Sequence, residues 1–272
     1  MKLAASNIAW SADTEQEVFR MLRRFGVSAI EVAPTRIWPE WRGATVTAAR
    51  EYRGQVESEG LSISSLQAIL FQKPELRLFG SDQDRDALMS HLRYCADLAA
   101  ELGAASVVFG APKNRDRGKL DESEAFVKAT EFFSQLAPYY AARSTQLVLE
   151  ANPSDYGCNF VTESGTAARL VRAVGADGFA LHLDSACMHL AHENPAASIL
   201  AAADILRHFH ASEPNLAGFA NPSSDHAGAA TALAQAGYQG YVALEMRAGD
   251  PAIPALEQAL AFVGPVYAGF QE

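Results

Sequence analysis

The amino-acid sequence predicts an α/β protein whose single domain, residues 1–272, is a closed (β/α)8 barrel. Three observations lead to this prediction. Strand-like and helix-like segments alternate along the chain in eight pairs, which is typical of a parallel sheet with crossover helices. The length suits one barrel, and no interior segment is rich enough in Pro, Gly and Ser to form a linker. Four strand-like segments also end in carboxylate or imidazole side chains.

Each strand-like segment is followed by a segment with helical character. The strands are expected at residues 2–8, 29–33, 62–67, 106–110, 146–151, 179–184, 206–212 and 241–246. The helices are expected to begin near Thr14, Thr45, Gln83, Asp121, Glu163, Ala196, His226 and Pro251.

Several helix boundaries carry local signals. Thr14 precedes Glu17 at the spacing of a capping box, and Pro251 suits the first turn of a helix. Glycines that suit the carboxyl ends of helices are Gly26, Gly103 and Gly237.

An open, doubly wound parallel sheet is the main alternative to a barrel. That fold normally places a glycine-rich phosphate-binding turn after an early strand. Here Asn7 is followed by Ile8, Ala9 and Trp10, and neither G-x-G-x-x-G nor G-x-x-x-x-G-K occurs anywhere in the sequence. The closed barrel is therefore favoured, and in it the carboxyl ends of all strands meet on one face.

Four residues stand at or near the ends of apolar strand segments: Glu150, Asp184, His210 and Glu245. A charge at the buried mouth of a strand costs several kcal/mol unless it is paired or bound to a metal. A structural salt bridge is the alternative for Asp184 and for Glu245, and a satisfied core histidine is the alternative for His210. Because four strands contribute such a residue, we predict that they share one metal ion.

The residue types narrow the identity of that ion. Three carboxylates and one imidazole form a hard, oxygen-rich ligand set, which suits Mn²⁺, Mg²⁺ or Co²⁺ better than a thiolate-type zinc site. Mn²⁺ is the expected cofactor, and open coordination positions would remain for substrate.

Composition and charge disfavour other classes of protein. The net charge of −10 disfavours a general nucleic-acid surface, which needs a basic stripe. No apolar run approaches the length of a membrane span, and the first residues lack the apolar region of a signal peptide. Three cysteines, Cys95, Cys158 and Cys187, imply no disulfide framework. We expect a cytoplasmic protein with a small-molecule partner, and its composition is compatible with a homo-oligomer.

Four segments carry a family resemblance: residues 149–153 (Leu-Glu-Ala-Asn-Pro), 183–185 (Leu-Asp-Ser), 210–215 (His-Ala-Ser-Glu-Pro-Asn) and 236–246 (Ala-Gly-Tyr-Gln-Gly-Tyr-Val-Ala-Leu-Glu-Met). With these segments, nearly the whole chain resembles the xylose-isomerase-like TIM barrels. This group contains sugar isomerases and epimerases, including ketose 3-epimerases, and endonuclease-IV-type enzymes. The resemblance implies that Glu150, Asp184, His210 and Glu245 are the metal ligands and that the substrate is a carbohydrate.

The resemblance also implies a mechanism. A divalent metal that holds a carbonyl oxygen and the neighbouring hydroxyl acidifies the proton on the carbon between them and stabilises an enediolate. Glu150 and Glu245 would act as base and acid on opposite faces of the sugar, which gives isomerisation or epimerisation. The alternative is a lyase or dehydratase that uses the same site on a sugar-like or polyol substrate. A noncatalytic or phosphodiester-cleaving relative is disfavoured by the ligand set and by the acidic charge, respectively.

One position departs from the family pattern. Many epimerases and endonuclease-type relatives have a histidine three residues after the aspartate of strand six, where this chain has Cys187. The substrate contact made there is therefore in question, and a multinuclear site loses support. Cys187 is predicted to be a small packing residue, with a reactive thiol as the alternative.

Further residues are candidates for substrate binding. His182 precedes Asp184 by two residues and so shares its side of the strand, where it would orient a ligand or pack as an interior histidine. Polar candidates for binding hydroxyl or carboxylate groups are Glu213, Asn215 and Arg247. Trp38 offers a wall for the C–H face of a sugar, or else a hydrophobic loop or subunit contact.

Residues at other strand ends and in two loops have less specific roles. Glu31 and Gln67 close the second and third strands and are predicted to support the site or to be polar residues of the barrel. Phe71 and the basic stretch 113–119 belong to a lid or, by preference, to solvated loops. The sequence leaves open which sugar is bound and whether it is phosphorylated.

Overall fold

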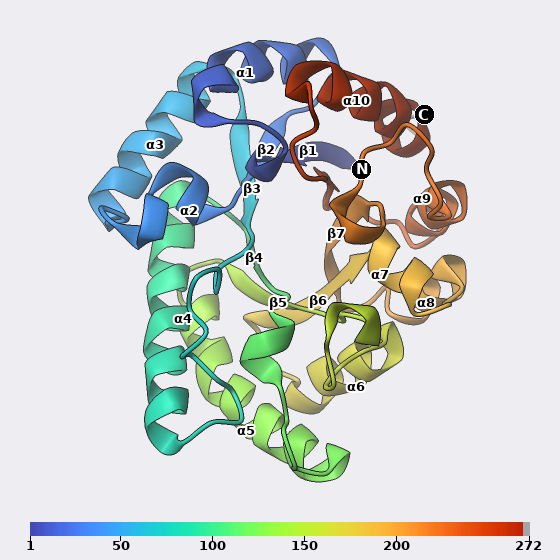
Figure 1. Cartoon of the computed structure of the whole chain (residues 1–272). Coiled ribbons are helices and arrows are strands. Elements are labelled where there is room, and N and C mark those ends of the chain that lie inside the picture. The colour runs from blue at the N-terminus through green and yellow to red at the C-terminus, as the bar shows by residue number, and fades with distance from the viewer. Residues whose placement is uncertain (269–272) are drawn as a thin grey trace.

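Eight parallel strands close into a barrel in the computed structural model of the chain, which describes residues 1–268 (Figure 1). Each strand pairs with the next in sequence, and β1 pairs with β8 to close the sheet. The strands are β1 (Lys2–Ser6), β2 (Ala29–Val32), β3 (Ser62–Leu66), β4 (Ser106–Phe109), β5 (Gln146–Glu150), β6 (Phe179–Asp184), β7 (Leu206–Ser212) and β8 (Tyr241–Glu245). The predicted single-domain TIM barrel is confirmed.

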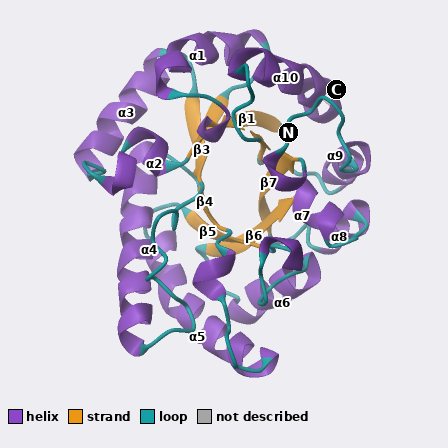
Figure 2. Ribbon diagram, viewed as in Figure 1, coloured by secondary structure: helices purple, strands orange, loops and turns teal. Residues whose placement is uncertain are grey.

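Helices form a ring around the strands (Figure 2). They are α1 (Glu15–Arg24), α2 (Pro34–Ile37), α3 (Val46–Ser58), α4 (Asp82–Leu102), α5 (Glu122–Ala141), α6 (Ser164–Val174), α7 (Ser185–Leu190), α8 (Pro195–Ala201), α9 (His226–Gln235) and α10 (Ala252–Ala268). The short helices α2 and α7 were not predicted, and both lie in loops that follow the carboxyl ends of strands. None of the helices within residues 1–268 combines the length and apolarity needed to cross a membrane.

The local boundary signals have mixed outcomes. Gly26, Gly103 and Gly237 have positive φ angles of 70°, 74° and 64° after the ends of their helices, as predicted for glycine caps. The predicted capping box at Thr14 is wrong, because the Thr14 hydroxyl donates to the Ser11 carbonyl at 2.9 Å instead of capping α1. A 3-10 turn at Asn7–Ala9 also ends β1 earlier than expected.

The barrel interior changes character from one end to the other. Ala4, Ala29 and Ala243 form a small apolar cluster of their own on β1, β2 and β8, apart from the main core. Nearer the carboxyl ends, buried charged and polar side chains replace them. These are Glu31, Ser65, His182, Asp184, His208 and His210.

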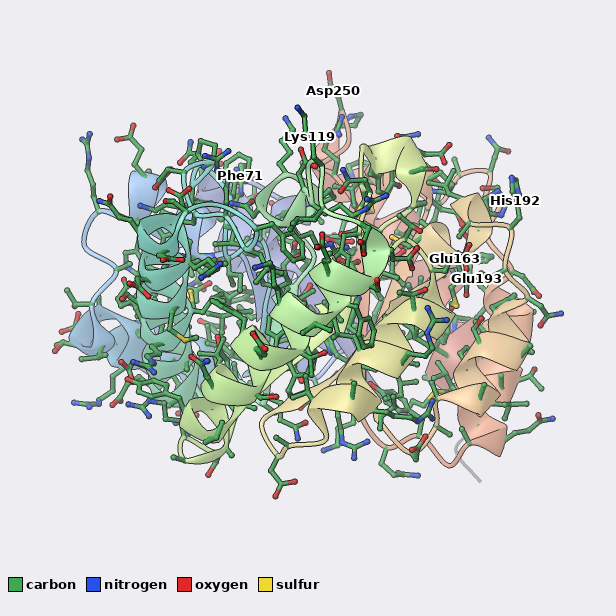
Figure 3. All side chains as sticks on the ribbon, turned by 90° about the horizontal axis from the view of Figure 1, so that it is seen from below. Phe71, Lys119, Glu163, His192, Glu193 and Asp250 are labelled. Carbon is green, nitrogen blue, oxygen red and sulfur yellow. The ribbon has the colours of Figure 1, made fainter. Side chains whose placement is uncertain are left out.

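The strand register brings the polar layer together at one mouth. Glu150 is paired in register with His182, Asp184 with His210, and Ser212 with Glu245. The side view in Figure 3 shows Phe71, Lys119 and Asp250 projecting at one end of the barrel. These three residues follow β3, β4 and β8, so this end is the one to which the strands bring their last residues.

Candidate metal and catalytic site

The four predicted metal ligands converge at the carboxyl end of the barrel. Glu150, Asp184 and Glu245 are the last residues of β5, β6 and β8, and His210 lies two residues before the end of β7. All four are buried, with exposures between 1% for His210 and 9% for Glu245. The barrel therefore places three carboxylates and an imidazole together in a largely water-excluded space.

The imidazole of His210 is the centre of this group. Its Nδ1 atom lies 3.2 Å from Glu245 Oε2 and 3.6 Å from Asp184 Oδ2. Within residues 1–268, that buried nitrogen makes no hydrogen bond. Glu150, His182, Asp184 and His210 each offer a ligand atom, and these atoms all lie within 4.8 Å of one another. A buried nitrogen without a hydrogen bond beside hard oxygen donors fits a divalent cation.

The other ring nitrogen of His210 is held by Glu31. His210 Nε2 donates to Glu31 Oε2 at 3.0 Å, and the same oxygen accepts from His208 Nε2 at 2.8 Å and from the Ser65 hydroxyl at 2.8 Å. An ionised carboxylate only accepts, so the hydrogen of a neutral His210 stays on Nε2. The lone pair of Nδ1 then faces the other carboxylates, an orientation typical of metal-binding histidines.

Charge compensation also sets the protonation of this pair. Burial would raise the pKa of Glu31, but His210 and His208 bring that pKa well below its usual range. Burial would lower the pKa of His210, but Glu31 and Glu245 raise it well above its usual range. The carboxylates around His210 therefore favour positive charge at this position, which a bound cation would also supply.

Of the three carboxylates predicted to bind the metal, Asp184 is the one whose pKa is lowered. Its Oδ2 accepts from the Ser212 hydroxyl at 2.6 Å, and its Oδ1 accepts from the backbone N–H of Cys187 at 2.7 Å, in the first turn of α7. Burial opposes ionisation, but His210 and these hydrogen bonds lower the pKa of Asp184 below its ordinary value.

Glu150 and Glu245 differ from Asp184 because their pKa values are raised above the ordinary value, whereas that of Asp184 is lowered. Burial, reinforced by the nearby charge of Asp184, raises the pKa of Glu150 to about 8. Burial also raises the pKa of Glu245, although His210 acts in the opposite direction. Such tuning of carboxyl groups is typical of residues that give and take protons in a reaction.

Gly110 gives the Glu150 side chain its space. It follows β4, the strand next to β5, and a Cβ atom placed there would collide with the Glu150 carboxylate. Sequence reasoning did not single out this glycine, since the requirement comes from a side chain on a neighbouring strand.

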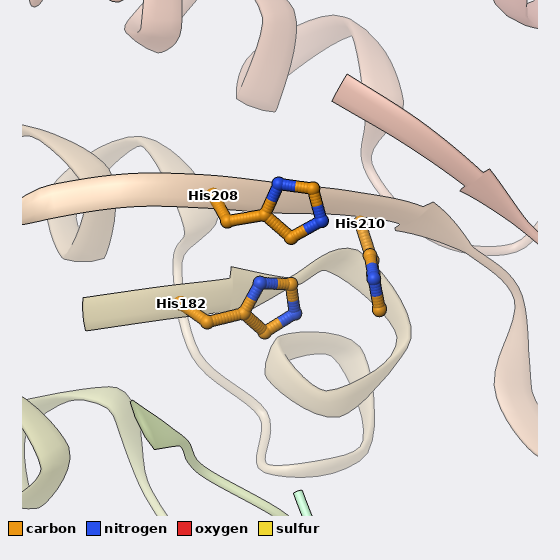
Figure 4. A group of neighbouring side chains, drawn as sticks. All are labelled: His182, His208 and His210. Atoms are coloured by element: carbon orange, nitrogen blue, oxygen red, sulfur yellow. The ribbon is translucent and has the colours of Figure 1, made fainter. Parts of the chain in front are cut away.

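His182 and His208 lie beside His210. Figure 4 shows the three rings, one from β6 and two from β7, grouped together. The ring centroid of His182 is 4.2 Å from that of His210 and 5.2 Å from that of His208. His182 Nε2 is 3.6 Å from Glu150 Oε1, and neither of its ring nitrogens has a hydrogen bond in the described part of the chain. His182 thus contacts the site from inside the barrel.

Two adjoining cavities open above the four residues. The larger has a volume of about 590 Å³ and the smaller about 360 Å³. Residues that line both are Gly110, Pro112, Glu150, Tyr156 and Glu245. The acid–base pair therefore stands where the two cavities meet, and a ligand in either one would contact it.

The predicted substrate-binding residues have different positions. Asn215 and Arg247 line the smaller cavity. Glu213 also lines it, but the Glu213 carboxylate is engaged by His226 Nε2 at 2.7 Å and by the Ser223 backbone N–H at 2.7 Å. Trp38 is 8% exposed, packs on Tyr52 with ring centroids 6.2 Å apart, and is absent from the described lining of both cavities.

Cys187 lines the smaller cavity with a buried thiol. Its sulfur lies 3.7 Å from Asn152 Nδ2 and 4.0 Å from Glu150 Oε1. Burial, together with the charges of Asp184 and Glu150, raises the pKa of Cys187 well above its ordinary value. The thiol is therefore neutral, which agrees with a packing role and not with a nucleophile.

The basic stretch 113–119 is only partly the solvated loop that the sequence favours. Arg115 is fully buried and donates to Asn152 Oδ1 at 2.7 Å. Asn152 in turn lines the smaller cavity. Sequence reasoning missed this contact because Arg115 stands among exposed basic residues and carries no local pattern of its own.

Comparison with known proteins identifies the family to which the chain belongs. The model of the family described as xylose isomerase-like TIM barrel matches residues 19–265. The chain belongs to this family. A search of curated proteins finds no match to this chain.

Solved structures share the fold along its whole length. D-psicose 3-epimerase from Clostridium cellulolyticum H10, with D-tagatose, has a TM-score of 0.81 at 15% identity, covering 98% of this chain and 99% of its own. The 3-keto-D-glucoside 4-epimerase YcjR from E. coli, in apo form, has a TM-score of 0.77 at 18% identity. That match covers 97% of this chain and 98% of the epimerase. The IOLI protein with a bound zinc atom has a TM-score of 0.78 at 16% identity, and the match covers 100% of both chains. At these identities the likeness concerns the fold.

We predict that Glu31→Gln weakens metal binding without abolishing the fold. The amide keeps the size of the carboxylate but loses the charge that fixes the Nε2 hydrogen of His210, and loss of such a partner typically costs about 10–100-fold in metal affinity. Titration of the metal-free protein with Mn²⁺ measures the affinity of wild type and variant. Glu213→Gln, which changes another buried carboxylate bonded to an imidazole, is the matched control. Equal Mn²⁺ affinity in wild type and Glu31→Gln would show that Glu31 has no such role.

We also predict that Glu213 stabilises the fold in a pH-dependent way. Burial opposes ionisation, but hydrogen bonds from His226 and Ser223 lower the pKa of Glu213 from 4.5 to about 2. The stabilisation is complete above the unfolded-state pKa and is lost as pH falls from about 4.5 towards 2. Glu213→Gln should cost about 1–3 kcal/mol at pH 7 and less at pH 3. Denaturant unfolding at both pH values, with exposed Glu51→Gln as control, tests this, and a cost independent of pH would contradict it.

Proposed function

We propose that this protein is a divalent-metal-dependent sugar or keto-sugar isomerase or epimerase. The observation that carries the proposal is the group of carboxylates around His210. His210 Nδ1, a buried nitrogen without a hydrogen bond in residues 1–268, lies beside Glu245 and Asp184. Glu150 offers a ligand atom within 4.8 Å of those of Asp184 and His210. These four residues would hold the ion, and the hard donor set supports Mn²⁺ first, with Mg²⁺ or Co²⁺ as alternatives. When bound, the ion supplies positive charge that acidifies a C–H bond next to a sugar carbonyl.

The chain's own carboxyl groups provide the proton transfers. Glu150 and Glu245 reach the cavities from β5 and β8, so they can address a sugar from different sides. One as carboxylate would remove the carbon-bound proton, and the other in its protonated form would return a proton to the substrate. The pKa values of both groups are raised above their ordinary values, which is typical of carboxyl groups that take part in proton transfer.

A carbohydrate substrate is supported by the polar lining and by the relatives. Asn152, Asn215 and Arg247 line the smaller cavity with groups that hydrogen-bond to hydroxyls. The solved relatives include a psicose 3-epimerase and a keto-glucoside 4-epimerase, whose reactions change the configuration at a carbon atom of a sugar. His182 is fully buried beside Glu150, so it would orient that carboxylate from inside the barrel.

The decisive test is exchange of a carbon-bound proton with solvent. With Mn²⁺ present, the wild-type protein should incorporate deuterium from D₂O into a reactive member of a ketose panel. Glu150→Gln and Glu245→Gln should lower the rate by about 10²–10⁴-fold, the usual cost of losing an acid or base. Both variants are compared at Mn²⁺ concentrations that saturate them, since each change also touches the metal site.

Glu193→Gln is the matched control, because Glu193 bonds to Ser164 and Ser198 away from both cavities. Its exchange rate should equal that of wild type. Turnover without solvent exchange, together with near-normal rates in both metal-loaded variants, would exclude the proposed chemistry.

A further inference from the structure

The two cavities above the site differ in chemistry. We use "polar limb" for the smaller cavity, lined by Asn152, Asp184, Ser212, Asn215 and Arg247. The "apolar limb" is the larger cavity, lined by Ile69, Leu70, Phe71, Pro74 and Val108. Glu150 and Glu245 line both limbs. A ligand that reacts between these carboxylates can therefore extend into two environments at once.

The volumes exceed the needs of a simple sugar. A monosaccharide occupies on the order of 200 Å³ at the packing density of organic crystals. The polar limb, at about 360 Å³, is large enough for it. The apolar limb adds about 590 Å³, within the range of pockets that hold drug-sized ligands. A free monosaccharide would leave most of that limb without ligand contact.

The wall of the apolar limb is built by hydrogen bonds. It is the loop between β3 and α4, whose carbonyls at Lys73 and Leu76 both accept from Asn114 Nδ2 at 2.7 Å. The Ile69 carbonyl accepts from His91 Nε2 at 2.8 Å. These bonds hold the loop in one shape, so the limb exists before a ligand arrives.

Backbone conformation in the same loop points to a functional constraint. Ala68 and Gln72 adopt positive φ angles of 51° and 63°, a region that side chains with a Cβ atom seldom occupy. Both residues line the apolar limb. Strain of this kind persists where surrounding contacts enforce it, and it gathers at ligand-binding sites.

Phe71 presents an aromatic ring at the mouth of the apolar limb. Its carbonyl accepts from Trp41 Nε1 at 3.2 Å, while the residue remains 58% exposed. Figure 3 shows Phe71 at the end of the barrel where the strands end. An exposed aromatic ring beside a largely apolar cavity is a surface that an apolar ligand group would cover.

We propose that the substrate is a keto-sugar that carries an apolar substituent, such as an aryl group. The sugar lies in the polar limb between Glu150 and Glu245, and the substituent lies in the apolar limb against Phe71. This inference rests on the proposed function, because the carboxylates that would act on the sugar define where the two limbs meet. Lys73 and Lys113 also line the larger cavity, so a sugar phosphate is the competing ligand that the test must separate.

The test compares glucosides that differ only in their substituent. Calorimetric titration of the Mn²⁺-loaded protein with phenyl and methyl β-D-glucopyranoside should show at least about tenfold tighter binding of the phenyl compound, because its ring buries more apolar surface. Phe71→Ala should reduce that preference by about threefold or more, because it removes the ring that the phenyl group would contact. Leu200→Ala is the matched control, since Leu200 is 45% exposed on α8, away from both limbs.

Three results would overturn the inference. They are equal affinity for the two glucosides, an unchanged preference in Phe71→Ala, and tighter binding of D-glucose 6-phosphate than of phenyl glucoside. Deuterium exchange into free ketoses, measured on the same preparation, separates this inference from the proposed function. Exchange without a phenyl preference would refute only the proposed apolar substituent and leave the proposed function standing. A phenyl preference without exchange in any keto-sugar would refute the proposed reaction and support only a cavity that binds aryl groups.

Discussion

The concentration of buried negative charge at one mouth of the barrel is the constraint on which the site depends. Glu31, Asp184 and Glu245 each lie beside His210, Glu150 lies beside His182, and each of the four carboxylates is at most 9% exposed. Ions removed from water cost several kcal/mol each unless they are paired. Histidines neutralise part of this charge, and burial raises the pKa values of Glu150 and Glu245. A divalent cation at this mouth would neutralise more of the charge.

This constraint explains how neighbouring residues divide their roles. Asp184 has three partners that favour its ionised form, namely His210, the Ser212 hydroxyl and the Cys187 backbone, so it is suited to stay a permanent ligand. At Glu150, burial and the charge of Asp184 outweigh the influence of His210 and Asn152, and Gly110 leaves room for its carboxylate beside the cavities. The difference between two carboxylates on adjacent strands thus follows from their hydrogen-bond partners.

Sequence patterns predict the fold and the group of four more fully than their surroundings. The strands that end at Glu150 and Glu245 are apolar runs closed by a carboxylate, and eight strand-like segments alternate with helices. The barrel, and with it one shared face for the carboxyl ends of the strands, follows from this pattern. The Glu31–His210 bond joins residues 179 positions apart and exists only because the barrel closes. The burial of Arg115 and the packing of Trp38 on Tyr52 likewise depend on tertiary contacts that no local pattern encodes.

The most direct test of the central claim is to locate the metal. Crystals grown with Mn²⁺ and measured at the manganese absorption edge should show one strong anomalous peak within about 2.0–2.3 Å of ligand atoms from Glu150, Asp184, His210 and Glu245. His210 should contribute Nδ1 while Nε2 remains bonded to Glu31. A peak among the rings of His182 and His208 instead, or no peak at the mouth of the barrel, would contradict the account.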